Sequence, residues 1–514
     1  MHTTYTGESE ENTTALEKYA TDASAFRIFP KKIFYPKTVA ELQAIVQDTI
    51  ENRRAGGTAS LTPRAGGTCM SGGPLTEEWV VDMTRHMHAV TIDPEARTAT
   101  VEAGAYFRDI ESEAKKHGLM FASYPSSHLL CGIGGMIGNN ASGEKSLRNG
   151  PTSANILSLE VVLADGSAVF LEPKVLPLAT SQREKTLVEF AHTYGEKLSH
   201  ATGNVPKAAS GYRLEKVIVG NTFSEIPLIV GAQGTLGIVT KAVLKLVPIP
   251  EHADLLLISA QSIGNLSDII ETVRAHNPEA LETFDINTYH KAEEVLPHYT
   301  RVVAPFLDTS AHLFILAQFS EDTKEATHAQ RSACEQSLLD KGYRVRHSEE
   351  VDVVASAWEI RRNAFLLMRD HNEEGLKAVP CIEDVIVPLP SLGIFIEELS
   401  SILIRRNIYY GFHGHIGDGS FRVIPVFDFS SPTLTDDIVG LTREVFELVK
   451  RLGGNMSADH SDGIIRTPFL KEFYGEELYR VFEDIKNLYD PENILNPGKK
   501  VGGTVAHIEK YLNR

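Results

Sequence analysis

Apolar residues recur at helical spacing near the start of the chain. Between Leu42 and Ile50 they fall mostly three or four positions apart, as on the buried face of an amphipathic helix. Thr38 and Glu41 form a capping-box pattern before this stretch, and the double glycine at 56–57 ends it. The sequence therefore predicts one helix ahead of the first glycine-rich segment.

Further along, apolar and polar residues alternate, which predicts strands. We expect a helix over 107–117 and two antiparallel hairpins, at 89–93 with 98–103 and at 157–164 with 167–171. The second hairpin turns at Asp165-Gly166, a pair suited to the positive φ angles of a type I′ turn. The first half is therefore predicted to be α+β.

A Pro-Ile-Pro break at 248–250 precedes a second α+β segment. Here the pattern predicts strands over 255–260 and 313–319, helices over 265–274 and 323–341, and an amphipathic tail over 468–488. The expected organisation is a polar N-terminal extension (1–28), a first domain (29–250), a second domain with a central antiparallel sheet (251–455) and a helical C-terminal segment (456–514).

Composition and charge exclude several classes of protein. The 514 residues carry a formal net charge of -18 that is spread along the chain, whereas nucleic-acid binding needs a basic face. Four cysteines lie far apart, without a zinc or disulfide pattern, and favour a reducing cytoplasm. The N-terminus has no signal-peptide pattern, and no stretch approaches ~18 unbroken apolar residues. We expect neither secretion nor a membrane span.

Two glycine-rich loops are the candidate cofactor site. Residues 63–73 contain four glycines, and residues 131–143 repeat the pattern. Backbone N–H groups freed of side chains suit an anionic ligand such as a phosphate, although a pair of tight turns would have the same composition. A Rossmann turn is excluded, because the GxGxxxG spacing within 131–143 is followed by a polar Asn-Asn-Ala-Ser-Gly instead of an apolar helix.

With two further motifs, at 159–166 and 230–240, these loops resemble the FAD-linked oxidases and dehydrogenases that share the vanillyl-alcohol oxidase or PCMH-type flavin domain. The resemblance covers nearly the whole chain and is closest to the D-lactate, glycolate and D-2-hydroxyglutarate dehydrogenase branch. It implies a two-subdomain FAD-binding domain, a substrate (cap) domain and a C-terminal segment that returns to the flavin.

The resemblance also implies a set of cofactor contacts. Ala65 and Gln233 depart from the commoner glycine and glutamate, and Thr68 stands where covalent relatives have a flavin-linked histidine, so we expect non-covalent FAD. The expected FAD-binding residues are Arg64, Ala65, Gly66, Gly67, Thr68, Ser71, Gly72, Pro125, Ser126, Gly134, Gly135, Gly138, Asn139, Ala141, Ser142, Gln233, Gly234, Gly237, Ile238 and Asn496.

Residues 411–422 and 457–463 hold histidines and carboxylates between glycines, a pattern of metal or acid–base sites, or of turns with satisfied histidines. In the branch they resemble, HGHxGDGNxH and an acid-His-Gly element provide two histidines and a glutamate for a divalent metal. Here His415 is kept, but Arg422 and Asp459 replace the other two ligands. An arginine keeps its proton, so we expect no metal and a guanidinium that clamps a substrate carboxylate instead.

Two more residues complete the predicted chemistry. Arg361 matches the arginine of a WxxR element that holds the substrate carboxylate in the branch, although an exposed helix arginine would look the same. His460 is the candidate general base, because an imidazole titrates near neutral pH and Asp459 beside it could orient it. The catalytic candidates are thus His460, Arg361, Arg422 and His415, which would take the hydroxyl proton and hold a 2-hydroxy acid while its hydride passes to the flavin.

Three functions stay open from the sequence. The first is an FAD-dependent dehydrogenase of a small, D-lactate-like 2-hydroxy acid. The second is a non-redox flavin transferase of the alkylglycerone-phosphate synthase type, and the third is a flavin-binding homologue with an altered catalytic site. A dehydrogenase would need a separate electron acceptor, such as a quinone, a cytochrome or another carrier, because no iron–sulfur cysteine array is present. A homodimer and peripheral attachment to the inner membrane face also stay open.

Overall fold

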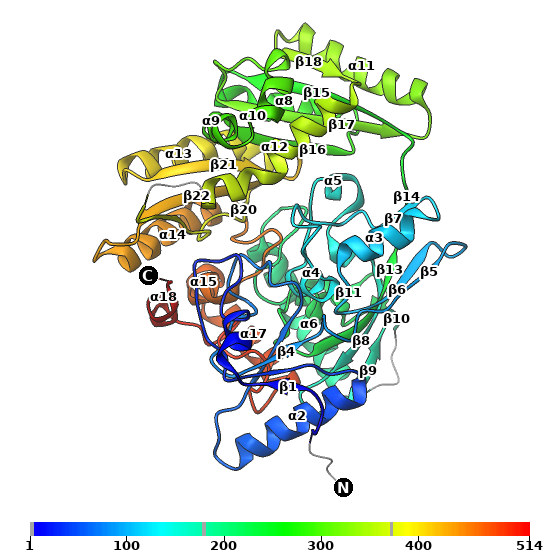
Figure 1. The fold of residues 1–514 in the computed structure, drawn as a ribbon, viewed down its shortest axis with the longest axis vertical. Coiled ribbons are helices and arrows are strands. Elements are labelled where there is room, and N and C mark those ends of the chain that lie inside the picture. Colours follow the sequence, from blue (N-terminus) through cyan, green and yellow to red (C-terminus); the bar gives the residue numbers. More distant parts are fainter. Residues whose placement is uncertain (1–4, 177–180, 371–373, 514) are drawn as a thin grey trace.

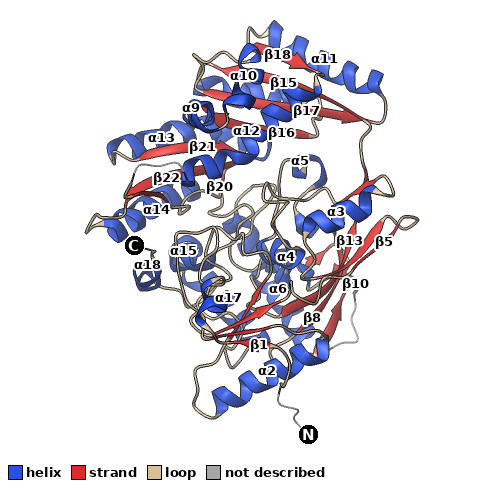
Figure 2. Cartoon of the chain, viewed as in Figure 1, coloured by secondary structure: helices blue, strands red, loops and turns tan. Residues whose placement is uncertain are grey.

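The computed structural model describes residues 5–176, 181–370 and 374–513 and has two lobes, which Figure 1 shows one above the other. The first lobe contains four separate sheets, and the second contains one large sheet with helices packed against it (Figure 2). The chain passes from the first lobe to the second between β14 (Val247–Pro248) and β15 (His252–Ala260). No helix in the described part of the chain is long and apolar enough to cross a membrane.

Two sheets form the framework of the first lobe. One has the order β1 (Ser9–Glu10), β2 (Lys32–Phe34), β4 (Trp79–Asp82) and β3 (Leu61–Arg64), in which β2 and β3 run parallel to β4. The other is antiparallel, with the order β5 (Val90–Asp93), β6 (Thr98–Glu102), β13 (Ile238–Lys245), β8 (Ile156–Val162) and β9 (Ala168–Leu171). α2 (Val39–Arg54) buries Leu42, Ile45 and Val46 against both.

The local predictions hold here with two corrections. Thr38 caps α2 by accepting from the Glu41 N–H, but the Glu41 carboxylate accepts from Lys37 N instead of Thr38 N, so only half of the capping box forms. The turn after β8 is not type I′, because only Gly166 has a positive φ and its N–H bonds to the Leu163 carbonyl. The helix over 107–117 is α3 (Phe107–Lys115).

The N-terminal extension is packed onto the first lobe from residue 5 onward. β1 pairs with β2, and Tyr19 donates its hydroxyl to Asp82 at 2.6 Å. Arg64, one of the expected cofactor residues, donates to the carbonyls of Tyr19 at 3.2 Å and Thr21 at 2.7 Å. The extension therefore braces the first glycine-rich loop.

The second lobe is built on an eight-stranded sheet. Its order is β18 (Arg344–Ser348), β15, β17 (Leu313–Glu321), β16 (Ala280–Asp285), β21 (Tyr409–Gly414), β22 (Ser420–Asp428) and β19 (Leu376–Ala378), with β20 (Val385–Ile386) also paired to β22. β15 and β17 contain the two predicted strands. The predicted helices are α8 (Leu266–Arg274) and α11 (Lys324–Asp340), and α12 (Val351–Asp370), α13 (Leu392–Arg405) and α14 (Leu434–Arg451) pack in the same lobe.

After α14 the chain returns to the first lobe. Asn455 forms an antiparallel bridge with Ile386 of β20, and Leu495 forms a parallel bridge with Leu61 of β3. The amphipathic tail between them is two helices, α16 (Leu470–Tyr474) and α17 (Glu476–Tyr489), because Gly475 adopts a φ of 82° that interrupts the helical path. Residues 455–467 therefore lie where the two lobes meet.

Candidate active site

A cavity with about 990 Å³ of empty space, part of it open to solvent, lies between the glycine-rich loops. His460, from the returning segment, is also in its wall. The expected cofactor residues found in the lining are Arg64, Ala65, Gly66, Gly67, Thr68, Pro125, Gly134, Gly135, Gly138, Asn139, Ala141, Gln233, Gly234 and Gly237. Loops far apart in the sequence thus meet around one cavity.

The glycines of this lining differ in whether packing within the protein requires them. Gly135 and Gly138 lie on α4 (Ile133–Asn139), and a Cβ added to either would have no neighbouring atom nearer than 3.6 Å. Such a Cβ would make only ordinary van der Waals contacts, so packing within the protein does not by itself require glycine at these two positions. In contrast, Gly66 is needed for loop packing, because its Cβ would lie 2.2 Å from the Leu130 carbonyl oxygen.

Other expected cofactor residues lie outside the lining. Ser126 is exposed, Ile238 is buried in the apolar core beside α2, and Gly72 packs against Phe26. Asn496 lies under the loops, where its amide donates to the carbonyls of Gly73 at 3.0 Å and Gln233 at 2.7 Å. Ser71 and Ser142 are buried and bonded to other side chains.

Several lining residues were not among the expected FAD contacts. They are Cys69, Gly73, Pro74, Met83, Ala103, Ser127, Cys131, Gly132, Met136, Ile229 and Val239. Many belong to or directly follow the two glycine-rich loops, so the loop pattern could have found them. Met83 and Ala103 directly follow β4 and β6, so their position in the cavity wall depends on how these strands pair.

Gln233 connects the cavity to the returning segment. Its Nε2 donates to Ser71 Oγ and to Asn139 Oδ1, both at 3.0 Å, and its Oε1 accepts from Gly463 N at 2.8 Å. A carboxylate could not donate to the Asn139 oxygen, whereas an amide both donates and accepts. These bonds use both the donor and the acceptor of the Gln233 amide.

A buried cluster of charged groups adjoins the cavity, and Arg422 of β22 is at its centre. Its Nη2 donates to Asp459 Oδ1 at 2.8 Å and lies 3.0 Å from His415 Nε2. Its Nη1 lies 2.6 Å from Nε2 and 3.0 Å from Nδ1 of His460. The antiparallel register of β21 with β22, which pairs His413 with Arg422, brings His415 to this position.

His415 bonds through Nδ1 to a carboxylate, and a second arginine bonds to that carboxylate. Its Nδ1 lies 2.7 Å from Glu282 Oε1, and Arg361 of α12 donates to Glu282 Oε2 at 2.5 Å. All three residues are buried. We call His415, Glu282 and Arg361 the first arm of the cluster.

His460 has the same arrangement. Its Nδ1 lies 2.9 Å from Glu383 Oε1, and the fully buried Arg466 donates to the same carboxylate. We call His460, Glu383 and Arg466 the second arm. In both arms we assign the Nδ1 proton to the carboxylate bond, which leaves the Nε2 lone pair toward Arg422.

The position of Glu383 corrects one prediction. Asp459 does not orient His460, because its Oδ1 lies 3.7 Å from His460 Nε2, whereas Glu383 is within hydrogen-bonding distance of Nδ1. Asp459 instead bonds to Arg422, and the buried Lys207 lies 3.3 Å from its Oδ2. The acid next to His460 in the sequence therefore bonds to Arg422, and an acid far away in the sequence bonds to the imidazole.

The electrostatics favour a neutral His415 imidazole and ionised carboxylates. Burial lowers the pKa of His415. Burial opposes the charge of Asp459, yet Arg422 and Lys207 hold the pKa of this carboxyl well below its ordinary value. Glu383 is also buried, but His460 and Arg466 lower its pKa to about 2.

Sequence reasoning missed Glu282, Glu383, Lys207 and Arg466. Glu282 is a charged residue within the apolar strand β16, and Glu383 with Asp384 forms a pair of acids directly before β20. A charge within or beside a buried strand is a signal that could have found them. Lys207 and Arg466 carry no such signal.

Arg361 is not an exposed helix arginine, since it is buried and paired with Glu282. Its Nε is buried and has no hydrogen-bond partner among the described residues. That N–H is therefore a hydrogen-bond donor with no acceptor among the described residues.

Two groups of side chains in the described part of the chain have metal-like spacing. Glu383, Asp384 and His460 form one, but Arg466 and Arg422 already contact Glu383, and Asp384 accepts the His460 backbone N–H at 2.7 Å. The pKa of Asp384 is raised to about 7 by burial and by the neighbouring Asp459. These groups are satisfied without an ion.

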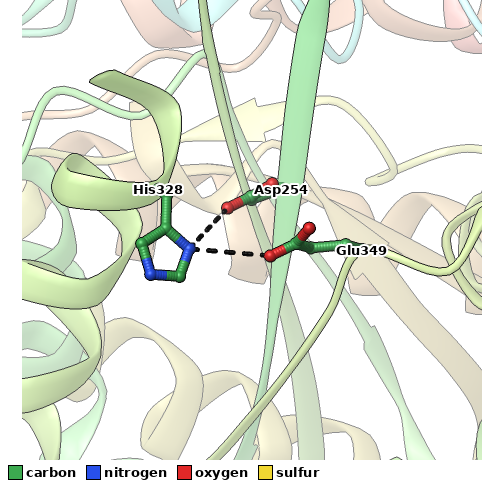
Figure 3. A group of neighbouring side chains, drawn as sticks. All are labelled: Asp254, His328 and Glu349. Carbon is green, nitrogen blue, oxygen red and sulfur yellow. Dashed lines mark ion pairs between the residues drawn. The ribbon is translucent and has the colours of Figure 1, made fainter. Parts of the chain in front are cut away.

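The other group is His328, Asp254 and Glu349 on the second lobe, where Figure 3 shows the imidazole facing both carboxylates. Arg331 Nη2 lies 2.8 Å from the same His328 Nδ1, and Lys324 pairs with Glu349 at 3.0 Å. Protein cations already compensate this surface group, so we assign no metal to it.

Several solved structures share this fold. The 4-ethylphenol oxidase from Gulosibacter chungangensis superposes with a TM-score of 0.70 at 17% identity, covering 96% of this chain and 94% of that one. p-Cresol methylhydroxylase gives 0.70 at 15% identity, with coverages of 97% and 94%. An alkyldihydroxyacetonephosphate synthase gives 0.65 at 15% identity, with coverages of 95% and 82%. At these identities the likeness shows the fold alone, which is that of the PCMH-type flavoproteins.

Family models and curated relatives narrow the class. The FAD binding domain matches residues 30–172, and the C-terminal domain of FAD linked oxidases matches residues 249–500. The chain therefore belongs to the FAD-linked oxidases, and FAD is its cofactor. The D-2-hydroxyglutarate dehydrogenase of Haemophilus influenzae is 29% identical over 508 residues, which are 93% of this chain and 49% of that protein.

Shorter relatives match over most of their length. A glycolate oxidase subunit of Bacillus subtilis is 27% identical, covering 94% of this chain and 91% of that protein. The D-lactate dehydrogenase of Archaeoglobus fulgidus is also 27% identical, with 85% of each chain covered. The chain spans only about half the length of the D-2-hydroxyglutarate dehydrogenases from Haemophilus influenzae and Escherichia coli.

Proposed function

We propose that the chain oxidises a small, D-lactate-like 2-hydroxy acid to its 2-oxo acid with non-covalently held FAD. The observation that carries this proposal is the position of His460, which belongs both to the wall of the cofactor cavity and to the charged cluster. A proton acceptor at this boundary can act on a substrate next to the flavin. Sequence relatives named as dehydrogenases of 2-hydroxy acids support the same substrate class.

His460 takes the hydroxyl proton of the substrate in this proposal. The bond from Nδ1 to Glu383 fixes the ring and stabilises the imidazolium that forms when Nε2 exchanges its contact with Arg422 for the substrate hydroxyl and accepts the proton. Bound FAD supplies the hydride acceptor for the substrate Cα–H. One proton and one hydride leave the alcohol, which yields the 2-oxo acid.

The cluster also supplies cations for the substrate carboxylate. Arg361 offers its unpartnered Nε–H, whereas both Nη atoms of Arg422 already contact protein acceptors. We therefore assign the carboxylate contact to Arg361 and an orienting role to Arg422. The carboxylate clamp first expected of Arg422 would require it to give up existing bonds.

Electrons then leave to a separate acceptor, such as a quinone or a cytochrome. The four cysteines are buried and free, and none belongs to a group with metal-like spacing in the described residues. A cysteine-ligated cluster therefore has no ligand set there.

Anaerobic mixing of the purified protein with D-lactate, D-2-hydroxyglutarate or glycolate tests the proposal. We expect at least one of them to bleach the oxidised flavin, and His460→Gln to slow bleaching by roughly 10²- to 10⁴-fold while retaining FAD. Acid precipitation should release all of the flavin into the supernatant. If no 2-hydroxy acid bleaches the FAD-loaded protein, the proposal fails, and a non-redox transferase becomes the favoured function.

A further inference from the structure

Three acceptor atoms converge on the guanidinium of Arg422. They are Nε2 of His415, Nε2 of His460 and Oδ1 of Asp459, at 3.0, 2.6 and 2.8 Å from its Nη atoms. Two imidazoles and a carboxylate directed at one centre are the donor set that proteins use for zinc and similar divalent ions.

The residues around these donors are also arranged like those around metal-binding histidines. Metal-ligating histidines commonly donate their other ring N–H to a carboxylate, which fixes the tautomer and aims the lone pair at the ion. Here Glu282 lies 2.7 Å from Nδ1 of His415, and Glu383 lies 2.9 Å from Nδ1 of His460. Each carboxylate is in turn held by a buried arginine.

A divalent ion does not fit among these residues as they stand. Arg422 is buried and within bonding distance of all three acceptors, and a guanidinium cannot release a proton to become a ligand. Although burial opposes its charge, Asp459 and Glu383 raise the pKa of Arg422 further above its usual value. The centre of the donor set is therefore filled by a permanent cation of the chain itself.

We infer that Arg422 is an internal cation that replaces a divalent metal, so that the site works without one. The substitution leaves the donors and their supporting carboxylates in place, and only the central cation differs. The catalytic part of this inference rests on the proposed function, but its metal-binding part does not.

Exchange of Arg422 for a ligand residue should then create a metal site. Arg422→His removes the guanidinium and adds a third imidazole beside His415, His460 and Asp459. Arg422→Lys is the matched control, because it keeps a cation at this position but cannot restore the same donor geometry. Arg422→Ala provides a second opened site if the histidine variant folds poorly.

The test measures Zn²⁺ binding to FAD-loaded protein in two ways, by calorimetry and by elemental analysis after gel filtration. Wild type and Arg422→Lys should retain no stoichiometric zinc at the cluster. Arg422→His should retain about one Zn²⁺ per chain and lose roughly tenfold or more in affinity when Glu282→Gln removes the support of His415. Dialysis of wild type against EDTA should leave the rate of flavin reduction unchanged.

Two results would overturn the inference. One is a divalent ion in wild type that disappears with His415→Ala. The other is an absence of zinc from both Arg422→His and Arg422→Ala when each retains FAD and its circular dichroism spectrum. If no 2-hydroxy acid reduces the flavin, the proposed function fails alone, since zinc binding is measured without substrate.

Discussion

Glu383 shows how a single carboxylate can set the chemistry of the site. It is fully buried and is shared between His460 and Arg466, so its loss would affect ring orientation as well as charge. We predict that Glu383→Gln lowers the rate of flavin reduction by roughly 10- to 100-fold, the usual cost of removing the group that orients a functional histidine. Stopped-flow reduction under anaerobic conditions measures this rate.

The same variant should keep its FAD, because Glu383 is not in the lining of the cofactor cavity. Its pH–rate profile should also change, since the neutral amide cannot stabilise an imidazolium as a carboxylate does. Glu444→Gln, which removes a half-buried partner of Arg405 and Arg406 outside the cluster, is the control and should match wild type. If Glu383→Gln kept the wild-type rate and pH profile, Glu383 would have no role in the reaction.

Sequence alone found the imidazoles of this site but not their partners. His415 and His460 stand out because they lie in glycine-rich motifs. Glu383 and Glu282 reach them only through strand pairing, of β20 with β22 and of β16 with β21. Asp459 was a reasonable partner by adjacency, but its carboxylate bonds to Arg422. Contacts between residues far apart in the chain cannot be read from local spacing.

At the scale of the element, Asp285 ends β16 and caps α9 (Ile286–Val295) by accepting from Thr288 N at 2.9 Å. Burial raises its pKa from 3.8 to about 6. The native state then binds more protons than the unfolded state between these values, so this group makes the free energy of unfolding fall as pH rises from about 4 to 6. Above pH 6 the penalty is constant and amounts to about 3 kcal/mol at most.

We predict that Asp285→Asn stabilises the protein more at pH 7.5 than at pH 5. Asparagine also caps helices well and stays neutral when buried, so it avoids the penalty while keeping the cap. Thermal unfolding of wild type and variant at both pH values measures the difference. Asp93→Asn is the control, because Asp93 accepts two backbone N–H groups in an exposed turn. An equal effect of Asp285→Asn at both pH values would contradict the prediction.

Elements with local signals were predictable from sequence, and those with non-local causes were not. α2, α8 and α11 follow from apolar spacing and caps, which act within one turn of helix. The position of β16 between β17 and β21 follows from non-local pairing, which for β21 joins residues more than a hundred positions apart. The resemblance of the glycine-rich loops provided the fold class that periodicity could not.

At the scale of the whole molecule, the function depends on how the two lobes meet. Figure 1 places α5 (Ser146–Asn149) at the face of the first lobe that looks toward the second. Lys145, directly before α5, pairs with the buried Glu279 of the second lobe at 2.7 Å. Arg362 of α12 pairs with Glu144 at 2.6 Å. These pairs join the lobes beside the cluster.

We predict that Lys145→Met loosens this contact, because it leaves the Glu279 carboxylate buried without its cation, at a cost of up to about 3 kcal/mol. Proteolysis of the connection at 248–252 should become faster and flavin reduction slower, while FAD content stays the same because one lobe forms nearly all of the cavity. Lys116→Met is the matched control, since Lys116 pairs with Glu113 at the same 2.7 Å on an exposed surface. Equal proteolysis and reduction rates in the two variants would show that the Lys145 pair does not hold the lobes in their working arrangement.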